Sequence, residues 1–137
     1  MNKIEFNTQI ATTIEQSKRL LELGLKPETA DMKLIPYSSE AMSIDYNDGN
    51  FLEGDLPPAW SLHRLISMLP GKIEMISCTM YIGYFVPKFD KNNISYIDML
   101  GYSKVFNEKS TLYDNIIDCI EWLIQKSYFN KEYLIKS

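Results

Sequence analysis

Few residues of this chain could carry out acid–base or nucleophilic chemistry. His63 is the single histidine among 137 residues, so a triad or a histidine metal site would have to include it. It stands beside Arg64 on the polar side of a predicted short helix, and no nucleophile or carboxylate lies at a motif spacing from it. We therefore predict that His63 is exposed, and we assign no catalytic residue.

The two cysteines, Cys78 and Cys119, are separated by 41 positions, without the close spacing of a redox or zinc pair. Free cysteine usually behaves as a small apolar residue, so we expect both to be buried. The acidic run from Asp45 to Asn50 suggests a calcium loop, but Gly49 falls at its fifth position where the sixth is required. We predict no metal site and no cofactor.

Acidic residues are concentrated in the segment from Leu34 to His63. It holds five carboxylates and no lysine or arginine, which gives it a charge of −5, whereas the whole chain sums to 14 − 18 = −4. The rest of the chain is therefore close to neutral. A solvated loop is the simplest interpretation of this segment. The alternatives are a negative face for a basic partner and a mimic of nucleic acid toward a DNA-binding protein.

Enzyme motifs are absent from the sequence. There is no Gly-rich phosphate loop, no nucleophile elbow and no paired zinc ligands. The alternative to a non-catalytic protein is a small-ligand binder or enzyme with a pocket beside the short helix, in which Trp60 would be a stacking wall and His63 and Arg64 polar groups.

Tyrosines in a predicted strand point to a contact surface. Because side chains alternate along a strand, Tyr81 and Phe85 should lie on one face of the sheet and Tyr84 on the other. One face must cover the core, so tyrosines on the opposite face are candidates for partner binding or homodimerisation. Hydroxyls that merely reach water are the competing explanation.

Composition limits the class of protein. At 137 residues and 45% hydrophobic content, we expect a single folded domain spanning 1–137. Only Arg19 and Arg64 are arginines, which argues against a nucleic-acid partner. No apolar stretch approaches the roughly 20 residues of a membrane span, so we expect a cytoplasmic protein without membrane association.

Periodic apolar residues predict the helices. The expected set comprises an amphipathic helix over 8–23 capped by Asn7 or Thr8 and ended by Gly24, one turn after Pro27, a short helix after Ser61, a long helix over 111–126 capped by Thr111, and a last turn capped by Asn130. Trp60 and Leu65 would form a hydrophobic staple at the short helix.

Runs of β-branched and aromatic residues predict strands at 72–76, 79–86, 95–100 and 103–106, with a polar loop over 87–93. Asp48-Gly49 favours a separate tight hairpin. The order of elements indicates an α+β fold, in which helices pack on one face of an antiparallel sheet of three to five strands.

Three segments, 23–32, 58–65 and 112–124, resemble small uncharacterised proteins from prophages and mobile elements of gut Bacteroides-type bacteria. The resemblance implies a bacterial, cytoplasmic, accessory role and carries no catalytic residues. From the sequence, our first hypothesis is a non-catalytic protein-interaction module that uses either a tyrosine-bearing face of the sheet or the acidic segment. Tyr81 and Tyr84 are the candidate binding residues on the two faces, and either face could be the one that the helices leave open.

Overall fold

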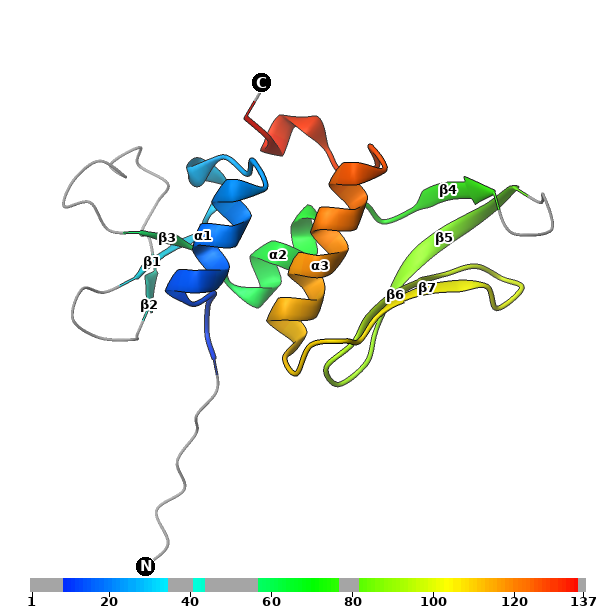
Figure 1. The fold of residues 1–137 in the computed structure, drawn as a ribbon, viewed down its shortest axis with the longest axis horizontal. Helices are drawn as coiled ribbons and strands as arrows, with labels where there is room; N and C mark the ends of the chain where they lie inside the picture. Colours follow the sequence, from blue (N-terminus) through cyan, green and yellow to red (C-terminus); the bar gives the residue numbers. More distant parts are fainter. Residues whose placement is uncertain (1–8, 35–40, 44–56, 77–81, 136–137) are drawn as a thin grey trace, which may run out of the picture.

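The computed structural model describes residues 9–34, 41–43, 57–76 and 82–135 (Figure 1). Its helices are α1 (Ile14–Glu22), α2 (Leu62–Met68) and α3 (Leu112–Gln125), with short 3₁₀ turns η1 (Pro27–Thr29) and η3 (Lys131–Tyr133). Its strands are β1 (Met32–Leu34), β2 (Ala41–Ser43), β3 (Pro58–Ala59), β4 (Ile73–Ile76), β5 (Ile82–Phe89), β6 (Ile94–Ile97) and β7 (Ser103–Phe106).

The larger sheet has the order β4-β5-β6-β7, and all its pairs are antiparallel. β4 pairs with the first half of β5, where Ile73 lies opposite Phe85. β6 pairs with the second half, where Val86 lies opposite Ile97. The two neighbours of β5 are therefore staggered along it. The predicted α+β class, with helices on one face of an antiparallel sheet, is confirmed.

Helix α3 occupies the centre of the described structure (Figure 1). It contacts β6 and β7 on one side and α1 and α2 on the other. Its buried side chains include Ile116, Ile117, Ile120 and Leu123, which lie at helical spacing and have no exposed surface. These residues join the helices to the inner face of the sheet in a single apolar cluster.

The start of α1 differs from the prediction. The helix begins at Ile14 because Thr13 forms a capping box: its hydroxyl accepts a hydrogen bond from Gln16 N at 3.1 Å, and Gln16 Oε1 accepts one from Thr13 N at 2.9 Å. The predicted caps at residues 7 and 8 are therefore wrong. The face that packs inward carries Gln16, Ser17 and Leu20, whereas Ile10 and Ile14 remain exposed.

The other helix ends follow the sequence signals. Gly24 has φ +103°, a left-handed conformation that glycine adopts without strain, and it follows α1 as predicted. Ser61, Thr111 and Asn130 each accept a backbone hydrogen bond at the start of the predicted helix or turn. The short turn after Pro27 is also present.

The connection predicted over 87–93 is wrong in part, because Pro87, Lys88 and Phe89 belong to β5 and pair with β6. Only residues 90–93 connect the strands, closed by a hydrogen bond from Asp90 N to Asn93 O at 2.9 Å. Proline carries no amide hydrogen to donate to a neighbouring strand, but strands tolerate it at an edge or a bulge.

A second sheet, with the order β2-β1-β3, was not predicted from the sequence. Its strands have only two or three residues each, too short for an alternating pattern to be recognised. The hairpin expected at Asp48-Gly49 lies outside the described residues.

Candidate functional site

The residues proposed for a pocket beside α2 do not converge on a common space. Trp60 has no exposed surface, and its Nε1 donates to Thr29 Oγ1 at 3.0 Å. Arg64 Nε donates to the Thr29 carbonyl oxygen at 2.7 Å, and its guanidinium carbon lies 5.5 Å from the centre of the Tyr133 ring. Both side chains thus hold η1 against α2. Since Trp60 is covered on all sides by the core, it offers no face for stacking.

His63 is exposed, as its position on the polar side of α2 predicted. Its side chain makes no hydrogen bond or ion pair with another residue of the described ranges. Tyr84 is exposed on the sheet, while Tyr81 lies outside the described residues. All five carboxylates of the segment 34–63 also lie outside them.

Cys119 is a free thiol with no exposed surface, as predicted. Burial raises its pKa to about 12, and the neighbouring charge of Asp118 adds to the shift. A thiol with so high a pKa is protonated at neutral pH, so it is a poor nucleophile and a poor metal ligand. Cys78 lies outside the described residues. Within the ranges that the structure describes, no three His, Cys, Asp or Glu side chains form a group that could hold a metal ion.

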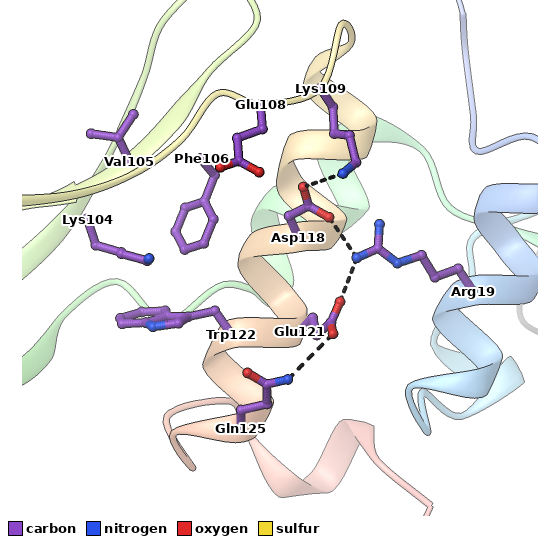
Figure 2. Close-up of a pocket in the computed structure, with 10 residues that line it drawn as sticks. All are labelled: Arg19, Lys104, Val105, Phe106, Glu108, Lys109, Asp118, Glu121, Trp122 and Gln125. Atoms are coloured by element: carbon purple, nitrogen blue, oxygen red, sulfur yellow. Dashed lines mark hydrogen bonds and ion pairs between the residues drawn. The ribbon is translucent and has the colours of Figure 1, made fainter.

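A groove of about 390 Å³ lies between α1, α3 and β7 (Figure 2). Helix α3 supplies Asp118, Glu121, Trp122 and Gln125, helix α1 supplies Arg19, and β7 with the residues after it supplies Lys104, Val105, Phe106, Glu108 and Lys109. Three cationic and three anionic side chains therefore line the groove, together with the rings of Phe106 and Trp122. This groove was missed from the sequence because Arg19 lies about a hundred positions from its partners, and no motif spacing covers such a distance.

Four of the six charged groups in this groove bind one another. Arg19 Nη2 lies 2.6 Å from Asp118 Oδ1 and 2.6 Å from Glu121 Oε2, and Lys109 Nζ lies 3.6 Å from Asp118 Oδ2. Burial lowers the Arg19 pKa, but the hydrogen bonds to Glu121 and Asp118 raise it by more than burial lowers it. The pKa therefore lies above its usual value. The side chain is about one-third exposed, which limits the network to about 1 kcal/mol. The ion pairs of Arg19 thus hold α1 against α3.

The outer face of the larger sheet is the other candidate. We define it by the side chains that alternate away from the helices: Glu74, Ile76, Ile82, Tyr84, Val86, Lys88, Ser95, Ile97, Ser103 and Val105, which pair across the strands in register. The opposite alternation buries Ile73, Phe85, Ile94, Tyr96 and Phe106 against the helices. Helices cover only that inner face (Figure 1).

Apolar side chains dominate the outer face. Ile76, Ile82, Tyr84, Val86 and Val105 are each between 44% and 71% exposed. Ile76 lies directly opposite Ile82, and Val86 lies directly opposite Ile97. Two cross-strand apolar pairs and the Tyr84 ring thus form a contiguous surface. The sequence prediction included Tyr84 but missed Ile82 and Val86, although period-two alternation from Tyr84 places both on its face.

Comparison with known proteins gives no match to a protein-family model, to a curated protein or to a solved structure. In the part of the chain that the structure describes, no helix combines the length and the apolar character needed to cross a bilayer. The choice between the two candidates therefore depends on their geometry.

Proposed function

We propose that this chain is a non-catalytic protein-interaction module whose binding surface is the outer face of the β4-β5-β6-β7 sheet. The observation that carries the proposal is the exposure of Ile76, Ile82, Tyr84, Val86 and Val105 on one continuous face. Soluble monomers seldom expose apolar side chains in such a group, and patches of this kind mark contact sites. An aromatic residue amid aliphatic ones is also typical of interface centres.

The sheet geometry supports a protein partner over a small ligand. The outer face is a broad surface supplied by four strands, whereas small ligands bind in concave pockets that enclose most of their area. The groove between α1 and α3 is concave, but four of its six charged side chains, those of Arg19, Lys109, Asp118 and Glu121, are already engaged with one another. A ligand that binds any of these four would have to break those contacts.

We further propose an accessory role in the bacterial cytoplasm, because the segments 23–32, 58–65 and 112–124 resemble prophage and mobile-element proteins. A small-ligand binder at Trp60, His63 and Arg64 remains the alternative from the sequence. It has weaker support, because Trp60 is buried and Arg64 is bonded to Thr29 and stacked on Tyr133.

The test is affinity capture from the native host with mass spectrometry, using wild type, Ile82→Lys and Ile135→Lys. Ile82 and Ile135 are 61% and 57% exposed, so the two substitutions introduce the same charge at equally open positions. Only Ile82 lies on the outer face. We expect Ile82→Lys to lose a partner that wild type and Ile135→Lys retain. Equal recovery of every protein by all three would contradict the proposal.

A further inference from the structure

The outer face carries two opposite charges on its β4 side, at neighbouring levels of the sheet. Glu74 lies directly opposite Tyr84 in the β4–β5 register. Lys72 precedes Glu74 by two residues, which places it level with Val86 and about 7 Å from Glu74 along the strand. The Lys72 ammonium lies 4.6 Å from the centre of the Tyr84 ring, so its side chain is on the outer face too. Both charged residues are exposed.

This layout is complementary to itself. Consider two sheets packed face to face about a twofold axis that lies between them and runs perpendicular to the strands. The axis passes over β5 midway between the levels of Tyr84 and Val86. The axis exchanges these two levels and leaves the lateral position unchanged, so β4 of each copy lies over β4 of the other. Glu74 of one copy then faces Lys72 of the second copy, and the reciprocal contact follows by symmetry. The same operation sets Tyr84 against Val86 of the second copy, twice.

We propose that the partner of the outer face is a second copy of this chain, packed in this antiparallel arrangement. The inference rests on the proposed function of the same surface. Aligned sheets pack about 10 Å apart with interdigitated side chains, and their strand directions differ by about 30°. The Tyr84–Val86 contacts at the centre are apolar, the aliphatic stem of Lys88 lies over Ile82 of the other copy at each end of β5, and the two Glu74–Lys72 contacts lie to one side. Opposite charges at fixed positions select this orientation over others.

The size of the face sets the strength of the dimer. β5 has eight residues, and β4, β6 and β7 have four each, so the outer face projects roughly 330 Å² at about 3.4 Å per residue and 4.8 Å per strand. A standard stable interface buries about 800 Å² on each partner. We therefore expect a weak, reversible dimer that forms only at high protein concentration.

The experiment is sedimentation velocity of the purified full chain over a wide concentration range. Wild type should shift from monomer to dimer as concentration rises. Glu74→Lys and Lys72→Glu should each weaken the dimer by about tenfold, since each replaces two attractive contacts with two repulsive ones. The double variant, with both substitutions in each chain, should return to within about threefold of wild type. Ile82→Lys should remain monomeric.

Matched controls are available on an exposed part of α1. Glu22→Lys and Lys18→Glu make the same charge reversals away from the outer face, and both residues are exposed. They should dimerise as wild type does. A wild-type monomer at every concentration would overturn the inference, as would single reversals at Glu74 and Lys72 without effect, or a double variant as weak as the single ones.

The outcomes also separate this inference from the proposed function. A chain that stays monomeric but captures a different protein through Ile82 overturns the homodimer and identifies a heterologous partner for the outer face. A chain that neither dimerises nor captures any protein in an Ile82-dependent manner overturns both proposals.

Discussion

Cys119 shows how burial determines the chemistry of a single side chain. It faces the core from α3 without exposed surface, and its pKa is raised from 9.0 to about 12, first by burial and then by the charge of Asp118. Below pH 9 the thiol is protonated in both the folded and the unfolded chain. Between pH 9 and pH 12 only the unfolded thiol ionises, so the free energy of unfolding must fall as the pH rises.

We predict that urea unfolding will measure a falling free energy of unfolding as the pH rises above 9. With Cys78→Ser as the background, adding Cys119→Ala removes the contribution of Cys119, which approaches 1.4 kcal/mol per pH unit. The doubly substituted chain should be less stable at neutral pH, because a buried side chain is shortened, and should have a shallower pH dependence. Equal slopes in the two chains would show that Cys119 already ionises freely in the folded state.

Residue types alone predicted part of the local chemistry. The exposure of His63 followed from its position on the polar side of a short helix, and the burial of Cys119 followed from the usual behaviour of free cysteine as a small apolar residue. The burial of Trp60 could have been expected from its role in a hydrophobic staple. Its hydrogen bond to Thr29 could not, because that contact depends on how η1 folds back toward α2.

At the scale of elements, Asn115 of α3 binds both the segment just before the helix and the β5–β6 connection, which lies 23 positions earlier in the chain. Its Nδ2 donates to the carbonyl oxygens of Asn92 at 2.6 Å and Lys109 at 3.1 Å, and its Oδ1 accepts from Lys109 N at 2.9 Å. The side chain has no exposed surface. It therefore holds the β5–β6 connection and the segment before α3 against the helix. Nothing in the spacing of an asparagine within an amphipathic helix predicts such a contact.

We predict that Asn115→Asp is strongly destabilising, by about 3 kcal/mol or more. The substitution keeps the shape of the side chain but turns a donor of two hydrogen bonds into an acceptor that faces two carbonyl oxygens, in a buried position. Asn107→Asp is the matched control, because Asn107 is exposed, and it should change stability by about 0.5 kcal/mol or less. Chemical denaturation measures both, and similar losses would contradict the assignment.

Helix and strand boundaries were predictable where a local signal stood alone. Thr111, Ser61 and Gly24 marked helix ends correctly, whereas the caps predicted for α1 at residues 7 and 8 were wrong and the structure uses Thr13. The continuation of β5 through Pro87 depends on pairing with β6. Long-range pairing decided that boundary against the local preference of proline.

At the scale of the whole molecule, the larger sheet is covered on one side only. Adjacent residues of β5 belong to different surfaces: Phe85 is 3% exposed beneath the helices, and Tyr84 is 54% exposed on the outer face. The sequence predicted this division from period-two alternation, but it could not assign the covered face, because that depends on where α3 packs. The contacts of α3 with β6 and β7 decide it.

We predict that folding depends far more on Phe85 than on its neighbour Tyr84. Phe85→Ala should cost about 3–5 kcal/mol of unfolding free energy, since it empties a buried site. Tyr84→Ala should cost about 1 kcal/mol or less, chiefly through its contact with the Lys72 ammonium. Urea unfolding at a concentration low enough to keep the chain monomeric measures both values.

If Tyr84→Ala were as damaging as Phe85→Ala, the outer face would be part of the monomer's own core. If the two differ as expected, the apolar area of the outer face contributes little to folding. Its burial free energy then remains available for association with another protein surface, on which both proposals for this chain depend.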